Sequence, residues 1–419
     1  MINPSLKCSN VVVKVASRCN LNCTYCYMYN RGDSSWKRQP KVMSNETIYF
    51  LAQRIKEHCM KHEIKKFNII IHGGEPLLAG IHFLKNFVGT INNNLFPDVK
   101  AEYSLQTNGT LLDEDWCKAF DELSINVGIS LDGIKEENDK YRIYHSGKGS
   151  YDDIVKGYNI LKQSNYVTKK KPGFLSVINI NADPIDTYQH FKNLRAYTVD
   201  FLLPEANFVT PAPKHSNSLS QTPYADWMIT IFDIWIKEDK ETRMRIRTFE
   251  FLIELILGNN LDFEVFGNSH NDVLVIETDG SIEAVDALKI CGEGFTKAGS
   301  NVKIHSFDEA IETPLAKTYV MAHKYLSSKC LACPINEVCG GGSLQTRYSK
   351  KNGFNNPSVY CKDLMKLITH IQNSIIDALP QHFIDNNMDR ITYEEVMDII
   401  EENMTEHSTS SYSTFISNF

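Results

Sequence analysis

A membrane-spanning helix is indicated by an apolar run of about 18 residues or more, and the sequence has no run of that length. Residues 1–9 lack the charged and apolar regions of a secretory signal peptide. Basic residues are in the minority, with 44 Lys and Arg against 51 Asp and Glu and a net charge of −7. The clustered positive charge that binds nucleic acid is therefore missing. We expect a cytoplasmic protein that has neither a membrane nor a nucleic acid as partner.

The first cysteine group lacks a fourth member. Cys19, Cys23 and Cys26 have the spacing C-x3-C-x2-C. Three thiolates on so short a loop cannot close a tetrahedral zinc site, which needs four ligands. They can hold three irons of a cubane cluster, so that a chelating small molecule can occupy the fourth. A half-disulfide framework, or a zinc site shared with distant cysteines, are the alternatives, although the reducing cytoplasm disfavours disulfides.

Strand-like and helix-like patterns alternate over the first 200 or so residues, as in a parallel α/β barrel or sheet. Four unusual motifs follow the ends of predicted strands, where such folds bind ligands. They are the cysteine group, Gly73-Gly74-Glu75-Pro76, Thr107-Asn108-Gly109 and Asp132-Gly133. The predicted strands are residues 11–16, 67–72, 102–106, 125–131, 174–180 and 199–203, and the predicted helices are residues 44–61, 77–93, 113–123, 151–163 and 184–196.

The alternation stops after Pro204. A Pro/Ser/Asn-rich connector, two helices, a hairpin and two C-terminal helices are predicted next, at residues 211–222, 224–236, 247–257, 273–286, 363–379 and 393–403. Asp279-Gly280 predicts a type I′ turn in the hairpin, and we expect the Ser-rich tail to be frayed. We predict four domains: a partial barrel (1–205), a helical connector (206–270), a cysteine-bearing domain (271–362) and terminal helices with the tail (363–419).

A second cysteine group has the pattern Cys330-x2-Cys333-x5-Cys339, with Cys361 further on. Four thiolates make a closed site, either for zinc or for a fully ligated iron–sulfur cluster. Cys8, Cys59 and Cys117 lie in helix or strand patterns and are expected in the core.

The first cysteine group, with an aromatic Tyr25 before its last cysteine, resembles the signature of the radical S-adenosylmethionine (SAM) enzymes. The resemblance implies a [4Fe–4S] cluster whose open iron takes the amino and carboxylate groups of SAM, and reductive cleavage of SAM to a 5′-deoxyadenosyl radical. It also implies SAM contacts by Gly73, Gly74 and Glu75 to the amino group, by Ser130 and Arg142 to the ribose and carboxylate, by Tyr25 and Leu203 near the adenine, and by Asn108. An ordinary turn for the glycine motif, and a surface salt bridge for Arg142, are the alternatives.

After such a core, the second cysteine group looks like the SPASM extension, which carries auxiliary [4Fe–4S] clusters. Full SPASM domains hold two clusters, but Val285 and Ser343 stand where further cysteine ligands are expected. We therefore expect one auxiliary cluster, with Cys291 as a buried thiol or an accessory ligand. The fold class predicted is α/β: a partial (β/α)6 TIM-type barrel with a C-terminal SPASM/twitch-like iron–sulfur domain and terminal helices.

Further motifs resemble a SPASM subgroup that matures ribosomally made peptides by forming three-residue cyclophanes, in which an aromatic ring is joined to a Cβ. These are the residues 26–36 after the first cluster, Pro40, Met43, and residues 200–204, 247–250, 277–280 and 339–342. The resemblance makes Asp286 the candidate base, with a pKa that a closed cavity would raise; Glu205 and Asp200 are rivals. It implies a precursor peptide and an electron donor such as flavodoxin or ferredoxin as partners.

Two other functions stay open at this point. Thioether formation, or oxidation of a Ser or Cys side chain to formylglycine, would use the same cysteines. A regulatory iron–sulfur or zinc module without turnover is an alternative of another class, but it gives no reason for the Gly-Gly-Glu-Pro motif or for Arg142.

Overall fold

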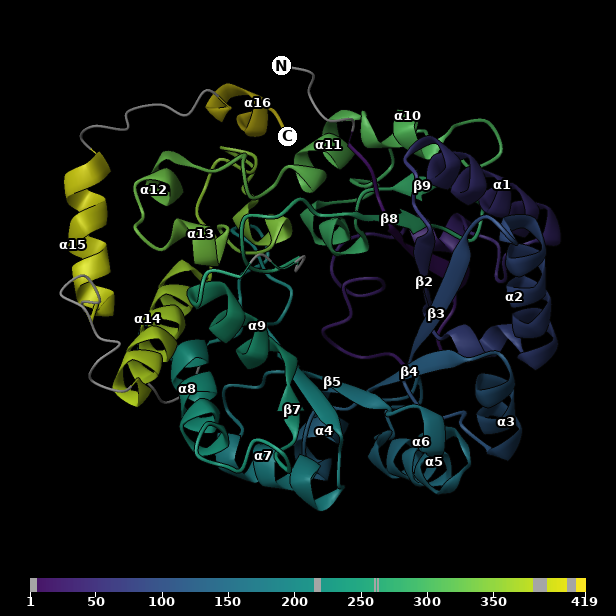
Figure 1. Ribbon diagram of the computed structural model, residues 1–419, viewed down its shortest axis with the longest axis horizontal. Coiled ribbons are helices and arrows are strands. Elements are labelled where there is room, and N and C mark those ends of the chain that lie inside the picture. Colours follow the sequence, from purple (N-terminus) through teal and green to yellow (C-terminus); the bar gives the residue numbers. More distant parts are fainter. Residues whose placement is uncertain (1–5, 215–219, 260, 262–263, 380–389, 405–411) are drawn as a thin grey trace. The chain divides into compact units, whose positions relative to one another are not determined.

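The computed structural model describes residues 6–214, 220–259, 261, 264–379, 390–404 and 412–419 (Figure 1). The chain forms two compact units. The first comprises Met1–Ser176, Ala196–Thr198 and Asp272–Val320, and the second comprises Val177–Arg195, Val199–Asn271 and Met321–Phe419. The division into four domains stays a prediction. None of the helices in the described residues is long and apolar enough to cross a membrane.

A mostly parallel sheet forms the centre of the first unit, with the strand order β5-β4-β3-β2-β1-β8-β9. Every neighbouring pair from β5 to β8 is parallel, and β9 runs antiparallel to β8. The strands are β1 (Asn10–Ala16), β2 (Lys66–Gly73), β3 (Lys100–Thr107), β4 (Ile125–Ser130), β5 (Gly173–Val177), β8 (Val273–Ile276) and β9 (Ile282–Glu283). The strands predicted in this unit are thus confirmed, with small shifts at their ends.

Helices cover the outer face of this sheet, as Figure 1 shows for α1, α2 and α3 beside β2, β3 and β4. They begin where the sequence supplies a cap: Ser44 accepts a hydrogen bond from Thr47 N–H, and Asp113 accepts one from Trp116 N–H. The helices are α1 (Asn45–Lys61), α2 (Ile81–Leu95), α3 (Glu114–Glu122), α4 (Lys135–Tyr141), α5 (Tyr151–Gln163), α6 (Tyr166–Lys169), α10 (Phe307–Ile311) and α11 (Pro314–Val320).

The predicted hairpin exists, but its turn is not type I′. A type I′ turn requires positive φ at both central residues. Among the described residues Gly280 has φ 85°, whereas Asp279 is not among the non-glycine residues with positive φ. Gly280 N–H donates to Glu277 O, and Glu277 N–H donates to Ser281 O. A single left-handed glycine therefore closes the turn, and β8 joins the sheet beside β1.

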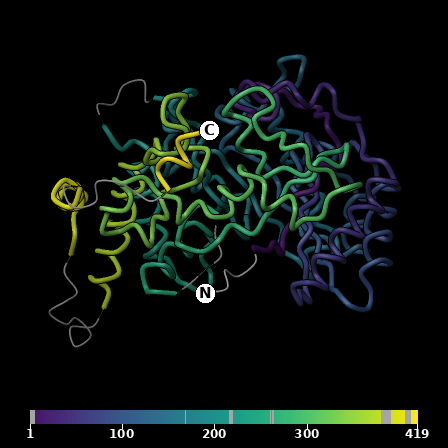
Figure 2. Tube along the Cα trace, turned by 90° about the horizontal axis from the view of Figure 1, so that it is seen from above, coloured from purple at the N-terminus to yellow at the C-terminus, as the bar shows by residue number. Residues whose placement is uncertain are grey.

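Helices dominate the second unit. Its elements are α7 (Pro184–Asn193), β6 (Thr198–Leu202), α8 (Pro223–Trp235), β7 (Arg245–Ile246), α9 (Arg247–Ile256), α12 (Ser328–Leu331), α13 (Asn336–Cys339), α14 (Cys361–Ala378), α15 (Tyr393–Met404) and α16 (Ser413–Ser417). The C-terminal helix α14 packs against α8, α9 and α15, the last seen end-on in yellow in Figure 2. Residues 405–411 of the Ser-rich tail lie outside the described residues, and α16 follows them.

Within the second unit, one carboxylate of α14 is hydrogen-bonded to the first turn of α8. Asp363, near the start of α14, accepts hydrogen bonds from Tyr224 N–H at 2.8 Å and Ala225 N–H at 2.9 Å. These are backbone donors that a helix N-terminus leaves unpaired. Tyr224 and Tyr360 also pack edge to face. The connector and the C-terminal helices, separated by over a hundred residues in sequence, thus share one core.

Candidate functional site

The loop after β1 brings the first three cysteines to the carboxyl end of the sheet. Cys19, Cys23 and Cys26 are all free thiols and partly exposed. Burial is the main reason that the pKa of Cys19 rises to about 12 and that of Cys26 to about 11. Thiolates are costly here unless a positive group stabilises them, and iron does so. The Asn108 side chain lies 3.8 Å from Cys19 Sγ, so the Thr107-Asn108-Gly109 motif borders this loop.

The backbone of the Gly73-Gly74-Glu75 motif is hydrogen-bonded to the chain just before the cysteine loop. Gly74 N–H donates to Ala16 O at 2.8 Å, and Glu75 N–H donates to Arg18 O at 2.9 Å. A Cβ on Gly73 would lie 2.3 Å from Ala16 O, and one on Gly74 would lie 2.5 Å from Arg18 O. Both glycines are therefore required by the close approach of two backbones, a reason that the sequence did not reveal.

The Glu75 side chain links the Gly73-Gly74-Glu75 motif to the end of β3. Its carboxylate is fully buried and accepts hydrogen bonds from Asn108 N–H at 2.8 Å, Leu77 N–H at 3.0 Å and the Thr107 hydroxyl at 2.7 Å. Burial raises the pKa of Glu75 to about 7 despite these hydrogen bonds. A nearby ammonium would favour the ionised form, so the group fits the predicted place beside the SAM amino group.

Arg142 is buried beside the cysteine loop and not in a surface salt bridge. It lies just past α4, a helix that the sequence did not predict because its stretch of Lys, Glu, Asn and Asp has no apolar face. Arg142 Nη1 donates to the Tyr25 hydroxyl at 2.9 Å, and that hydroxyl donates to Asp132. Arg142 Nε is buried without a hydrogen-bond partner. An orphaned guanidinium donor at this place fits a ligand carboxylate.

Ser130, at the end of β4, accepts a hydrogen bond from Gln106 Nε2 at 2.8 Å. Leu203 follows β6 in the second unit and is partly exposed. Both stay predicted SAM contacts.

A buried ionic cluster surrounds Asp286. Its carboxylate forms an ion pair with Lys14 of β1 and accepts a hydrogen bond from the Tyr27 hydroxyl at 3.0 Å. Lys14 Nζ also lies 3.0 Å from His72 Nδ1, in the neighbouring strand β2. Although burial alone would raise the pKa of Asp286, Lys14 holds it well below its usual range. The expectation of a raised pKa was wrong because a lysine on β1 reaches into the same buried space.

The other candidate bases belong to the second unit. Glu205 is partly exposed and accepts a hydrogen bond from Gln345 Nε2 at 2.8 Å. Asp200 forms an ion pair with Arg247 at 2.6 Å and accepts the backbone N–H of Thr248 at 3.1 Å. It therefore fastens the start of α9, a structural role.

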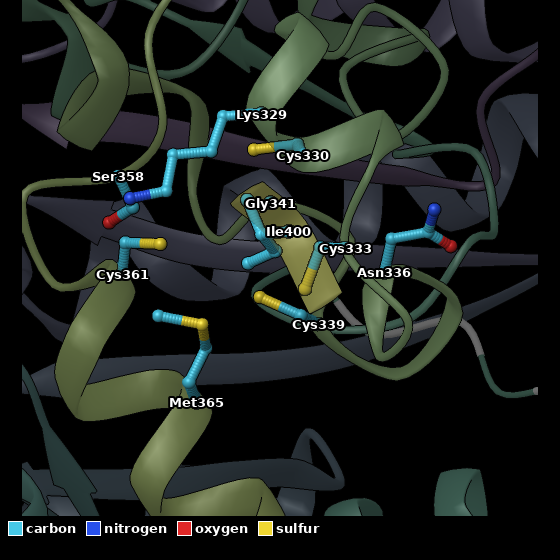
Figure 3. Close-up of a pocket in the computed structure, with 10 residues that line it drawn as sticks. All are labelled: Lys329, Cys330, Cys333, Asn336, Cys339, Gly341, Ser358, Cys361, Met365 and Ile400. Atoms are coloured by element: carbon cyan, nitrogen blue, oxygen red, sulfur yellow. The ribbon is translucent and has the colours of Figure 1, made fainter. Parts of the chain in front are cut away.

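The second cysteine group converges on one pocket (Figure 3). Cys330 comes from α12, Cys339 from α13 and Cys361 from the first turn of α14, with Cys333 between the first two helices. Their sulfur atoms face a common space that Met365 and Ile400 line with apolar atoms. Burial raises the pKa of Cys333 to about 11 and that of Cys361 to about 12. Four thiols in this arrangement fit a closed metal site.

The remaining cysteines are buried. Cys8, Cys59 and Cys117 are at most 2% exposed, as expected for core thiols. Cys291 is also buried, at the end of the 3₁₀ helix Asp286–Cys291. The structure places no disulfide among the eleven cysteines, all of which lie in the described residues.

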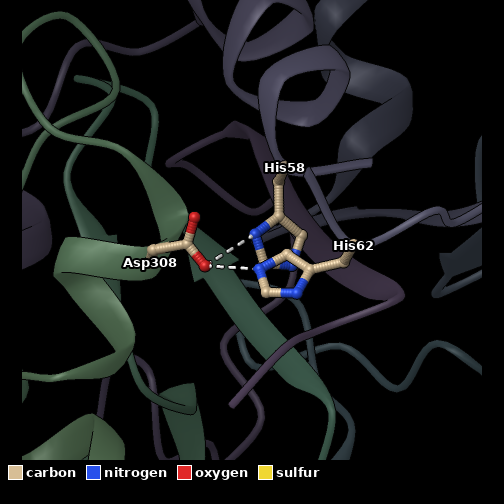
Figure 4. Close-up of side chains that lie close together, drawn as sticks. All are labelled: His58, His62 and Asp308. Carbon is tan, nitrogen blue, oxygen red and sulfur yellow. Dashed lines mark hydrogen bonds and ion pairs between the residues drawn. The ribbon is translucent and has the colours of Figure 1, made fainter. Parts of the chain in front are cut away.

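Three further possible metal ligands meet between α1 and α10 (Figure 4). Asp308 Oδ1 lies 2.6 Å from His62 Nε2 and 3.4 Å from His58 Nδ1. His58 Nε2 accepts a hydrogen bond from the backbone N–H of Cys8 at 3.1 Å. A neutral imidazole carries one proton, which must then lie on Nδ1, facing Asp308. That nitrogen has no lone pair for a metal ion, so the three residues form a polar tie between two helices.

The burial of His58 between these helices predicts that the folded protein loses stability in acid. Burial is the main reason that the pKa of His58 falls to about 4, so the folded protein resists protonation of this ring. The unfolded chain binds this proton below about pH 6.5, and stability is then lost as the pH falls from there towards 4, by up to roughly 3 kcal/mol. We expect His58→Gln to reduce the drop in anaerobic melting temperature between about pH 7 and pH 5. The exposed His82→Gln is the control; an equal drop in both variants would contradict the assignment.

Sequence reasoning assigned no role to Lys14, Tyr27 or His72, and it noted Asp132 only as part of a turn motif. Lys14 carried a detectable signal, because a lysine inside the apolar run Val11-Val12-Val13-Lys14-Val15 must find a buried partner. The partner itself could not be found, since Asp286 is 272 residues away in sequence.

Residues 13–197 match the sequence profile of the Radical SAM superfamily. A cysteine-type anaerobic sulfatase-maturating enzyme of Clostridium novyi is 29% identical over 392 residues, which are 93% of this chain and 97% of the relative. A serine-type anaerobic sulfatase-maturating enzyme of Bacteroides thetaiotaomicron is 26% identical, over 88% of this chain and 90% of the relative.

Solved structures agree on the fold. Native anSMEcpe with bound AdoMet has a TM-score of 0.75 at 24% identity and covers 88% of this chain and 98% of its own. Streptococcus suis SuiB bound to precursor peptide SuiA has a TM-score of 0.57 at 14% identity and covers 85% and 76%. These likenesses confirm the predicted α/β fold on a parallel sheet. Residues 13–197 form a radical SAM domain, and the protein is a radical SAM enzyme with SAM and a [4Fe–4S] cluster as its cofactors.

Proposed function

We propose that the protein oxidises a side chain of a polypeptide after a hydrogen atom has been removed from a Cβ. The observation that carries this proposal is the relationship, over nearly the whole chain, to sulfatase-maturating enzymes. Cys19, Cys23 and Cys26 would hold the SAM-cleaving cluster, and Cys330, Cys333, Cys339 and Cys361 an auxiliary [4Fe–4S] cluster. When bound, SAM and these clusters supply a 5′-deoxyadenosyl radical and an electron acceptor. A flavodoxin or ferredoxin would be the electron donor.

The side chains of the first site have a division of tasks. Arg142 would bind the SAM carboxylate through its unpaired Nε, and Glu75 would lie beside the SAM ammonium, whose charge keeps this buried carboxylate ionised. Tyr25, fixed between Arg142 and Asp132, would border the adenine. Ser130, Asn108, Gly73, Gly74 and Leu203 complete the proposed SAM contacts.

The substrate must also lose a proton once the carbon radical has formed. Asp286 is our candidate acceptor, because the ion pair with Lys14 keeps it deprotonated. The same ion pair makes it a weak base, so proton transfer would need Lys14 to shift towards His72, which lies 3.0 Å from Lys14 Nζ. Glu205 is the second candidate, held by Gln345.

Two products are compatible with loss of a Cβ hydrogen, one electron and one proton. The curated relatives favour formylglycine. A serine side chain gives this aldehyde directly, whereas a cysteine side chain gives a thioaldehyde that water then hydrolyses to the aldehyde with release of hydrogen sulfide. A crosslink from an aromatic ring to Cβ is the second candidate. It is favoured by the chain's own residues, because Val285 and Ser343 occupy two expected ligand positions and leave one auxiliary cluster, and by the motif resemblance to the cyclophane-forming subgroup.

A deuterium experiment tests the common step. Peptides deuterated at Cβ of a cysteine, a serine or a residue two positions after an aromatic residue are incubated anaerobically with reduced protein and SAM. We expect deuterium in the 5′-deoxyadenosine and a peptide that has lost two hydrogens, or that has become an aldehyde reactive to hydroxylamine. An aldehyde identifies formylglycine; a ring-to-Cβ bond in tandem mass spectra identifies the crosslink. Unlabelled deoxyadenosine with unmodified peptides would contradict the proposal.

The ion pair at Asp286 gives a second test. Replacing Lys14 by Met removes the cation that lowers the pKa of Asp286, and this pKa then rises because of burial. In Lys14→Met, Asp286 would become protonated below about neutral pH and could no longer accept the substrate proton. We therefore expect product formation by this variant to fall below neutral pH, where Asp286 of the wild type stays deprotonated, while deoxyadenosine formation persists. Lys66→Met, which removes a surface lysine paired with Glu102, is the control. A pH profile like the wild type would contradict a role for Asp286.

A further inference from the structure

Arg347 is a fully buried cation with no carboxylate partner in the described part of the chain. It ends the 3₁₀ helix Leu344–Arg347 and is 1% exposed. Backbone carbonyls satisfy all five of its N–H bonds. Nε donates to Gly341 O at 3.0 Å, Nη1 to Ala322 O at 2.7 Å and Tyr325 O at 3.4 Å, and Nη2 to Gly340 O at 2.7 Å and Gly342 O at 2.6 Å.

The glycine run that surrounds this guanidinium follows directly on a proposed cluster ligand. Gly340, Gly341 and Gly342 come after Cys339 and have φ of 60°, 78° and 69°. Three consecutive left-handed residues turn their carbonyls to one side, a conformation that side chains resist. A Cβ on Gly341 would lie 3.0 Å from Arg347 Cζ. Gly341 also lines the pocket of the four cysteines (Figure 3), so one short loop borders both the cation and the thiols.

Carbonyl dipoles do not neutralise a charge. An ionised group that is removed from water needs a counter-charge as well as hydrogen bonds. Burial disfavours the charged form of Arg347, whereas Cys330 and Cys339, once they are thiolates bound to a cluster, would favour it. A cluster bound by four thiolates is negative, and it becomes more negative when it accepts an electron.

We propose that Arg347 is the counter-charge of the cluster held by Cys330, Cys333, Cys339 and Cys361, and that it raises the reduction potential of this cluster. The proposal rests on the cluster assigned to these cysteines under the proposed function. A fixed positive charge stabilises the reduced cluster more than the oxidised one, because reduction adds negative charge. Arg347 is thus a positioning and tuning residue for an electron acceptor; it touches no substrate.

The test is a redox titration of one cluster. Full-length protein with Cys19, Cys23 and Cys26 replaced by alanine is reconstituted with iron and sulfide, so that the second site alone holds a cluster. Electron paramagnetic resonance gives its midpoint potential in the parent, in Arg347→Met and in Arg347→Lys. We expect the methionine variant to be at least tenfold harder to reduce, which is about 59 mV for one electron. The lysine variant keeps the charge and should stay near the parent.

Iron content and the control decide the other outcomes. Arg54→Met removes an arginine that also donates to backbone carbonyls, those of Val302 and Lys303, and should leave the potential unchanged. If Arg347→Met holds no cluster, the result for Arg347→Lys decides. A potential of Arg347→Lys close to that of the parent supports the proposal. Loss of the cluster or a lowered potential in Arg347→Lys shows that Arg347 has only a structural role, and this overturns the proposal. An unchanged potential in Arg347→Met, an equal fall in both variants, or zinc in place of iron in the parent would also overturn it. No peptide product is measured, so this outcome is independent of which product the enzyme makes.

Discussion

Replacing Gly74 by alanine is expected to lower the rate of 5′-deoxyadenosine formation by at least about 100-fold, the loss typical of a small misplacement at a reacting centre. The added Cβ would lie 2.5 Å from Arg18 O and 2.6 Å from Arg18 C. Both atoms are backbone, so relief requires the chain immediately before Cys19 to move. The hydrogen bond from Glu75 N–H to Arg18 O, which fixes this segment, would be strained at the same time.

Gly89→Ala provides the matched control, because a Cβ at this position in α2 would meet no atom within 4 Å. Alanine is the better helix former by up to about 1 kcal/mol, so this variant should be slightly more stable and fully active. The measurement is chromatography of deoxyadenosine from anaerobically reduced protein, together with iron content. Wild-type turnover and iron in Gly74→Ala would show that the Gly73-Gly74-Glu75 motif does not position the cysteine loop.

The second large effect is expected at the other cysteine group. Cys333→Ala should abolish modified peptide while deoxyadenosine still forms. A site with four protein thiolates offers no open iron to a substrate, so its proposed role is to take the electron that the substrate radical must lose. Without it, the radical has no route to product, but SAM cleavage at the first site is untouched.

Asn336 lines the same pocket without supplying a thiol, so Asn336→Ala serves as the control. Deoxyadenosine formation in Cys333→Ala reports on the folding of the first site within the same experiment. Unchanged yield of modified peptide from Cys333→Ala would refute the electron-acceptor role.

Local patterns made much of the fold predictable. The first five strands were visible as short apolar or alternating stretches. Ser44 and Asp113 indicated where two helices begin, because a helix cap involves only a few neighbouring residues. The cysteine groups were visible for the same reason, since ligand spacing is local. Helix α4 was missed because its residues are polar all round and it is held by its surroundings.

Long-range partners were out of reach. The family resemblance made Asp286 a candidate base, but its low pKa depends on Lys14, far away in sequence. The sequence also showed Gly73-Gly74 without showing that Ala16 and Arg18 press against them. Arg347 gave no signal, because its partners are backbone carbonyls, which every residue has.

The proposed chemistry depends on a cluster held by Cys19, Cys23 and Cys26 whose fourth iron would bind SAM. The most direct measurement is the electron paramagnetic resonance spectrum of that cluster, reduced, with and without SAM, in full-length protein in which Cys330, Cys333, Cys339 and Cys361 are replaced by alanine. We predict that SAM changes the spectrum, and that Cys23→Ala in the same background removes the signal. A spectrum that SAM leaves unchanged would contradict the account.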